Sequence, residues 1–150
     1  MKDCGECSLC CKLIAVPGLA EAGEWCPYCE PGRKEGGCTI HDSRPPFCKG
    51  YHCFWRAESW PDKYRPDKCK VIFEALPGVF TILISVDPAR PDAWKEKEIL
   101  EVIEKLRKKG RPLILKTKNN SEMFLPEGWD KQDVMVEIKK VIDLKKEWYR

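Results

Sequence analysis

The chain of 150 residues has room for one ordinary domain, or for a small metal-stapled module joined to a modest apolar region. Its 27 Lys and Arg nearly balance its 24 Asp and Glu, so the charge gives no reason to expect nucleic-acid binding. The N-terminus lacks the apolar run of a signal peptide, and no stretch approaches the roughly 20 apolar residues that cross a bilayer. We therefore expect a soluble, cytoplasmic protein that is not membrane-bound and whose cysteines stay reduced.

Nine of the ten cysteines lie near the N-terminus, between residues 4 and 53. They open as C-x2-C-x2-C-C, continue as W-C-P-Y-C, and close in the stretch G-G-C-T-I-H-D-S-R-P-P-F-C-K-G-Y-H-C. Two residues between paired cysteines form a turn that brings both sulfurs to one side, as in structural zinc sites and iron–sulfur loops. The predicted metal ligands are Cys4, Cys7, Cys10, Cys11, Cys26, Cys29, Cys38, Cys48 and Cys53.

A disulfide framework is the main alternative reading of so many cysteines. It is disfavoured because no signal peptide precedes them and because Cys10 and Cys11 are adjacent. The two histidines, His41 and His52, fall in the same stretch. Nine thiols can fill two four-coordinate sites without them, so a ligand role and a supporting role both stay open.

Residues 1–60 are expected to form a metal-binding cysteine module with little regular structure. Arg44, within it, is interpreted either as a donor to thiolates or as an ordinary surface residue. Residues 61–150 are expected to form an α+β region packed against the module. Cys69, outside the cluster, is expected to pack as a small apolar side chain.

The region after residue 60 shows the patterns of a ββαββα layer, a four-stranded antiparallel sheet with two helices on one face. The strands are predicted over 70–76, 79–86, 113–118 and 122–125, and the helices over 93–109 and 130–148. Phe80, Ile82, Ile84 and Val86 alternate and predict one apolar face of a strand. Asp92 is the predicted N-cap of the first helix, Gly110 its stop, and Leu100 one of its inward-facing residues. In the last helix Val134, Ile138, Val141, Ile142 and Trp148 fall on the predicted inner side.

The cysteine pattern resembles the family of zinc- or iron-chelating proteins named for its CxxCxxCC motif. The matching residues are Cys4, Cys7, Cys10 and Cys11, then C-x2-H-x2-R-P-x2-C over residues 38–48, and Cys53. The similarity continues in Trp25-Cys26-Pro27 with Cys29, and in Asp87-Pro88-Ala89 with Trp94. Many members have Tyr at the position of His41 and His at the position of Tyr28.

This resemblance implies metal chelation in bacterial and archaeal proteins that are mostly uncharacterised. A related module occurs in flagellin lysine methylase, but this chain shows no S-adenosylmethionine loop, so that activity is not carried over. Zinc is the expected metal, as one or two ions, in a structural or metal-handling role. An iron–sulfur protein in electron transfer, or one supporting an enzyme, is the alternative.

A thiol-redox enzyme built on the C-x-x-C pair Cys26 and Cys29 is a third hypothesis. It is disfavoured because seven other cysteines surround the pair in sequence. The C-terminal half carries no histidine and no glycine-rich phosphate loop, so any chemistry is expected in the cysteine module. Whether the protein is an enzyme, and what partner or substrate it binds, stays open.

Overall fold

The structure, a computed structural model, describes the backbone of residues 1–148 and the side chains of residues 1–143. The first 69 residues contain short helical segments joined by loops: α1 (Cys10–Leu13), η1 (His41–Ser43), α2 (Pro46–Gly50), α3 (Phe54–Ala57), η2 (Asp62–Tyr64) and α4 (Pro66–Cys69). The sheet and the longer helices follow: β1 (Val71–Ala75), β2 (Ile82–Val86), η3 (Ala93–Lys95), α5 (Lys97–Lys108), β3 (Leu113–Lys116), β4 (Ser121–Phe124) and α6 (Lys131–Trp148). The molecule is therefore α+β.

The four strands form one mixed sheet in the order β1-β2-β3-β4. The outer pairs are antiparallel, but β2 and β3 run parallel, with Ile82 opposite Leu113. The expectation of a fully antiparallel sheet is therefore wrong at the central pair. Helix α5 lies between β2 and β3 in sequence, and such a helical crossover returns the chain to the same end of the sheet, so the next strand runs parallel.

One face of the sheet, the α5 face, holds the main apolar core. Alternate strand residues, among them Phe73, Ile84 and Leu115, pack there with Ile99 and Ile103 of α5. Phe73 is 4% exposed and Ile84 and Leu115 at most 1%, so this face is dry. The burial of these side chains is the main stabilising term of the region, at roughly 1.5–3 kcal/mol for each large one.

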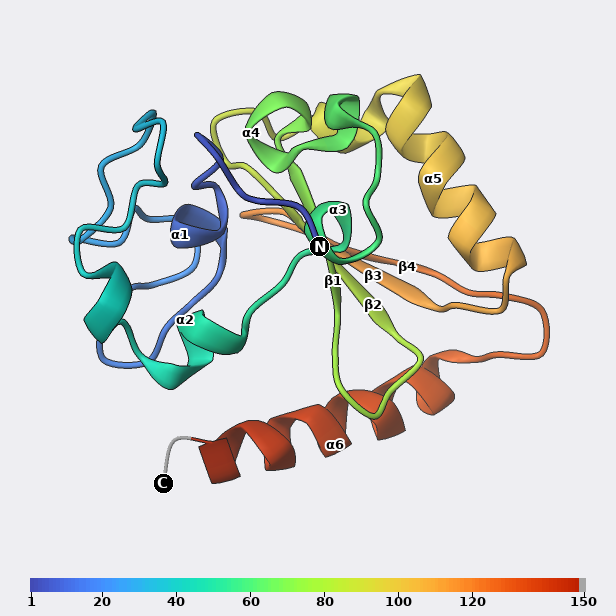
Figure 1. Cartoon of the computed structure of the whole chain (residues 1–150). Helices are drawn as coiled ribbons and strands as arrows, with labels where there is room; N and C mark the ends of the chain where they lie inside the picture. Colours follow the sequence, from blue (N-terminus) through green and yellow to red (C-terminus); the bar gives the residue numbers. More distant parts are fainter. Residues whose placement is uncertain (149–150) are drawn as a thin grey trace.

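The opposite face of the sheet, named the module face, is contacted by the N-terminal segment around α1 (Figure 1). Leu9 and Leu13, from α1 and the residue before it, pack on Ile72 of β1, which is 0% exposed. An ion pair adds a second link, because the Lys12 ammonium lies 2.7 Å from the Asp87 carboxylate just after β2. The segment around α1 thus contacts the sheet through a small apolar cluster and a largely buried ion pair.

The chain passes from one face to the other around the outer strand β1. Cys53 packs with the module-face cluster, whereas Phe54, the next residue, belongs to the core of the α5 face. Trp60 continues on that face, 5.5 Å from Phe54 and 5.3 Å from Phe73 between ring centroids. The predicted boundary near residue 60 stays a prediction. Phe54 and Trp60, which lie before that boundary, pack against the core of the sheet.

Several boundaries and faces differ from the predictions. Helix α5 begins at Lys97, because Ala93–Lys95 forms a separate 3-10 turn and Glu96 is extended, so Asp92 precedes that turn and does not cap α5. Phe80 is 63% exposed, since the strand ladder starts only at Ile82. Leu100 is 40% exposed, whereas Ile99 and Ile103 are the buried residues of α5.

Helix α6 lies at the end of the sheet that carries the β1–β2 turn (Figure 1). The Glu137 carboxylate holds it there by accepting the backbone N–H groups of Phe80 and Thr81, each at 2.8 Å. Val134 and Val141 are buried as predicted, but Ile142 is 50% exposed, and the side chain of Trp148 lies outside those described. Within residues 1–148, no helix is long and apolar enough to pass through a bilayer.

Candidate metal centre

Two C-x-x-C pairs form the tight turns that their spacing predicts. The N–H of Cys7 donates to the carbonyl of Cys4 at 3.0 Å, and Cys29 donates to Cys26 at 2.9 Å. Gly5 has a φ of +56°, a conformation that residues with a Cβ adopt at a cost, which explains a glycine inside the first turn. Each turn brings its two cysteines to neighbouring positions on one loop.

A short hairpin connects the second turn to Cys38. Cys29 and Cys38 form an antiparallel bridge, which the Glu30 N–H extends by donating to the Gly37 carbonyl at 2.8 Å. The Gly37 N–H donates to the buried Ser8 hydroxyl at 3.1 Å, and this hydroxyl also hydrogen-bonds the Cys29 sulfur. A Cβ on Gly37 would lie 2.6 Å from that hydroxyl and 2.9 Å from the sulfur, so this site requires glycine.

Helix α1 presents two adjacent thiols to this hairpin. The Cys11 sulfur is hydrogen-bonded to those of Cys10 and Cys29, and its carbonyl accepts the Cys26 N–H at 2.9 Å. The contact with Cys10, together with burial, holds the pKa of Cys11 far above its ordinary value. Burial and the neighbouring Cys11 raise the pKa of Cys29 to about 12. Thiolates crowded in this way repel one another unless a cation lies among them.

A cavity of about 100 Å³ lies beside α1. Its thiol lining is Cys10, Cys11, Cys26, Cys38 and Cys48. Helix α2 supplies Cys48, and Pro46 at its first turn has the fixed φ that a helix start requires. Burial raises the pKa of Cys48, and the thiols of Cys11, Cys26 and Cys38 raise it further. Cysteines up to 38 positions apart in sequence thus line one small cavity.

Arg44 also lines this cavity, with its Nε buried and without a hydrogen-bond partner among the described side chains. Its positive charge favours the thiolate forms of Cys11 and Cys48, although other groups outweigh it. This placement favours the interpretation of Arg44 as a donor to the cluster. Tyr51 lines the same cavity, and its hydroxyl is likewise buried without a partner in the described part of the chain.

Cys53 lies beside the first C-x-x-C turn. The Lys2 N–H donates to the Arg56 carbonyl at 3.3 Å, and the Arg56 Nε donates back to the Lys2 carbonyl at 2.8 Å. These bonds tie the N-terminal residues to α3, whose N-cap is Cys53. Burial raises the pKa of Cys53, and Cys4 adds to this. Burial likewise raises the pKa of Cys7 to about 12, with Cys53 contributing.

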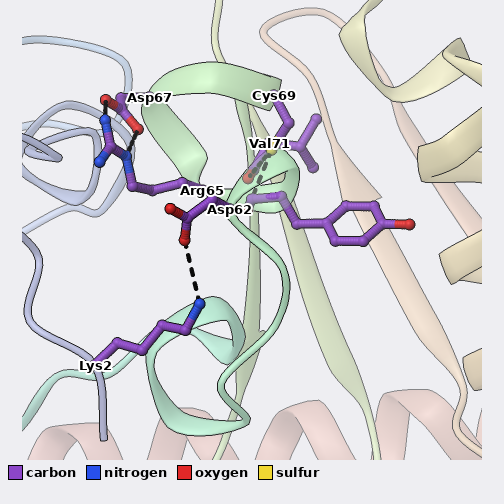
Figure 2. A network of polar contacts seen from close by, with 7 residues as sticks. Lys2, Asp62, Arg65, Asp67, Cys69 and Val71 are labelled. Atoms are coloured by element: carbon purple, nitrogen blue, oxygen red, sulfur yellow. Dashed lines mark hydrogen bonds and ion pairs between the residues drawn. The ribbon is translucent and has the colours of Figure 1, made fainter.

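The Cys7 thiol also hydrogen-bonds the Asp67 carboxylate, but this carboxylate is already engaged. Arg65 donates to both of its oxygens, from Nε at 2.6 Å and from Nη2 at 2.8 Å (Figure 2). Burial alone would raise the pKa of Asp67, but the Arg65 guanidinium outweighs it and lowers the pKa. Asp67 is therefore a neighbour of the thiols whose oxygens are committed to arginine.

Cys69 lies apart from the cluster. Its thiol donates to the carbonyls of Tyr64 at 3.5 Å and Val71 at 3.3 Å, the latter drawn in Figure 2. Its side chain packs against the core of the α5 face, so the prediction of a structural role is confirmed.

Each histidine has one ring nitrogen beside a neighbouring side chain. The His41 side chain is 63% exposed and lies 3.4 Å from the Asp42 carboxylate. The Nδ1 of His52 lies 3.0 Å from Nη1 of Arg56. A guanidinium only donates, so Nδ1 accepts, and this ring nitrogen is not free for a metal.

The nine thiols are gathered in one part of the molecule, half-buried and not in disulfides. Among the described residues, no group of three or more His, Cys, Asp or Glu side chains stands in an arrangement that could hold an ion as it is. The sequence pattern did not predict the roles of Ser8 and Tyr51 or the close packing at Gly37. The pair Gly36-Gly37 before Cys38 was the one signal that pointed to the last of these.

Comparison of the chain with protein-family models, with curated proteins and with solved structures found no match.

Proposed function

We propose that the protein binds metal, chelating zinc as one or two ions through the cysteine cluster in residues 1–60, with the α+β region supporting that module. The observation that carries the proposal is the gathering of nine free thiols around α1, including buried ones whose pKa is raised by burial and by neighbouring thiols. A divalent cation would offset both effects at once.

The donor set fits such an ion chemically. Thiolate sulfur is a preferred ligand of zinc, and structural zinc sites take four such ligands in a tetrahedron. The two C-x-x-C turns fix their sulfurs through the backbone, and Ser8 and Arg44 supply hydrogen-bond donors beside sulfur. Bound zinc would supply a cross-link between distant loops and a positive charge among the thiolates. The side chains would close from their present spacing around the ion.

The same all-sulfur donor set suits iron–sulfur clusters, so an iron–sulfur protein in electron transfer, or one supporting an enzyme, is the alternative. The resemblance to the CxxCxxCC family is compatible with either metal. A thiol-redox enzyme has less support, because Cys26 and Cys29 lie in a loop hairpin and not at the end of a sheet strand. The proposal includes a reducing compartment, the cytoplasm, where such thiols stay free.

The test is metal content and the visible spectrum of protein purified without oxygen. The expected result is about two zinc per chain and no colour, following from nine thiols and four-coordinate ions. The Cys69→Ser variant is the matched control and should keep the same metal content, because its thiol lies outside the cluster. Brown protein with iron and acid-labile sulfide would replace zinc by the iron–sulfur alternative, and protein that takes up neither metal would refute both.

A further inference from the structure

The nine thiols separate into groups by their contacts. Cys7 and Cys53 are electrostatic neighbours, and the charge of Cys4 also raises the pKa of Cys53. Cys11 contacts Cys29, and the neighbours that raise the pKa of Cys48 are Cys11, Cys26 and Cys38. In these electrostatic contacts, no thiol of the first group is paired with one of the second, although Cys4 and Cys7 also line a cavity together with Cys11 and Cys38.

The backbone builds these groups independently. The reciprocal bonds between Lys2 and Arg56 bring the first turn to α3. The bond from Cys26 to Cys11 and the bridge between Cys29 and Cys38 join the hairpin to α1. The first group is thus held against the sheet, and the second is built within residues 11–48.

Cys10 is the junction between the groups. Neighbouring residues on a helix point about 100° apart, so Cys10 and Cys11 diverge, although their sulfurs are in contact and both line the cavity beside α1. Cys11 faces Cys29, whereas Cys10 packs on the cluster of Leu9, Leu13 and Ile72, against which Cys53 also packs. Both are also electrostatic neighbours of the Tyr51 hydroxyl, and Tyr51 lines the cavity with Cys48 as well, so Cys10 lies between the two groups.

Other candidates for the first group are engaged elsewhere. Both oxygens of Asp67 accept from Arg65, and the Cys69 thiol donates to backbone carbonyls. Cys10 lines a cavity with Cys4 and Cys7 and is the further sulfur donor that brings the group of three thiols to the four that a tetrahedral ion takes.

We infer that the protein has two separate metal sites, one held by Cys4, Cys7, Cys10 and Cys53 (the Cys53 set) and the other by four of Cys11, Cys26, Cys29, Cys38 and Cys48 (the Cys48 set). This inference rests on the proposed zinc binding. The Cys53 set includes a ligand from beyond α2 and requires α3 in place. The Cys48 set has one thiol more than a tetrahedral ion needs.

The experiment uses the full reduced chain, Zn²⁺ as the only added metal, and double Cys→Ser variants. Two substitutions within one set should remove one ion and leave the other, so C7S/C53S and C26S/C38S each fall from two zinc per chain to one. The combination of all four substitutions should bind none. C69S is the control and should keep two.

Thiol labelling with N-ethylmaleimide identifies the ligands of the ion that remains. In zinc-loaded C26S/C38S, the Cys53 set should be protected while Cys11, Cys29 and Cys48 react. Wild-type chain loaded with one Zn²⁺ gives a reading that does not depend on any variant folding. Its singly loaded molecules should be protected either at the Cys53 set or at four thiols of the Cys48 set, never at a mixture of both.

The outcomes separate this inference from the proposed function. A wild-type chain that takes up no zinc overturns both. A wild-type chain that binds zinc overturns the two-site inference alone if C7S/C53S loses every ion, or if Cys53 is protected together with Cys26 in singly loaded wild-type molecules. A single ion per wild-type chain also overturns it and leaves the proposed function standing.

Discussion

Gly37 is the residue at which the hairpin and the segment before α1 come closest together. Its φ lies outside the left-handed region, so the backbone alone would accept alanine. The space does not: a Cβ would meet Ser8 Oγ at 2.6 Å, Cys29 Sγ at 2.9 Å and the Glu30 carbonyl oxygen at 2.9 Å. Two of these groups belong to the cysteine cluster or support it, so the contact matters for metal binding as well as for folding.

We expect Gly37→Ala to lower the free energy of unfolding of the zinc-loaded module by about 1–3 kcal/mol, the usual cost of overpacking. Zinc affinity should fall as well, because Cys29 must move. Thermal unfolding by circular dichroism and a chelator competition assay measure the two effects. Gly50→Ala is the control, since a Cβ there meets nothing within 4 Å. Equal behaviour of the two variants would contradict the steric argument.

Arg44 is the positive charge beside Cys11 and Cys48. Replacing it by Ala should weaken zinc binding about ten- to a hundredfold, the usual effect of removing a group that supports the metal ligands from outside the coordination shell, here through its positive charge. Competition with a chromophoric chelator measures this change. Arg33→Ala is the control, because Arg33 is exposed and pairs with Glu30 at 3.3 Å. If the zinc affinity of Arg44→Ala equals that of wild type, the interpretation of Arg44 as an ordinary surface residue is correct.

The sequence pattern predicted the local turns of the site better than its assembly. The spacing of Cys4 with Cys7 and of Cys26 with Cys29 was sufficient, because each turn closes within four residues. The approach of Cys53 to Cys7 was not visible, since it depends on bonds between Lys2 and Arg56, 54 residues apart. The role of Ser8 escaped notice for the same reason.

At the scale of elements, the strands and long helices were predictable because apolar periodicity marks them. The parallel pairing of β2 with β3 was missed, since pairing direction depends on the path of α5 and leaves no mark in either strand. The exposure of Phe80 was missed because its N–H donates to Glu137 of α6, a contact between distant residues, and the strand β2 starts only at Ile82.

Glu137 is 7% exposed and anchors α6 to the start of β2. Burial alone would raise its pKa, but the hydrogen bonds from Phe80 and Thr81 outweigh it and lower the pKa from its ordinary 4.5. The carboxylate therefore stabilises the fold fully above pH 4.5, and this contribution is lost as the pH falls through the lower folded value.

We expect Glu137→Gln to lower the free energy of unfolding by about 1.5–3 kcal/mol at neutral pH, the usual worth of hydrogen bonds to a charged group. The difference from wild type should shrink on acidification, as the wild-type carboxylate becomes protonated. Urea unfolding across the acid range measures it. Glu127→Gln, at an exposed position, is the control and should match wild type throughout. A difference independent of pH would argue against the carboxylate as the cause.

At the scale of the whole molecule, the apolar core is unevenly shared. The sheet and α5 hold the larger cluster, whereas the module-face cluster contains Leu9, Leu13 and Ile72 as its buried members. A segment of this size with so few buried apolar side chains depends on cross-links for its stability.

We expect a strong chelator to increase amide hydrogen exchange across residues 4–52 while β1–β4 and α5 stay protected. The α3 segment should follow the sheet, because Phe54 packs in the core of the α5 face. Hydrogen-exchange mass spectrometry with and without chelator measures this, and the metal-free chain under the same conditions is the control. A chelator-insensitive pattern, or uniform loss of protection, would contradict the expected two-part behaviour.

The cysteine module is also the cover of one side of the sheet, where Leu9 and Leu13 shield Ile72. A chain that released its metal would bare this strand surface while the rest of the sheet remained formed. Exposed apolar strands are what chaperones bind and what proteases and aggregation act upon. The lifetime of the protein in the cell would then follow the supply of metal, with its abundance adjusted by degradation and without any change in its synthesis.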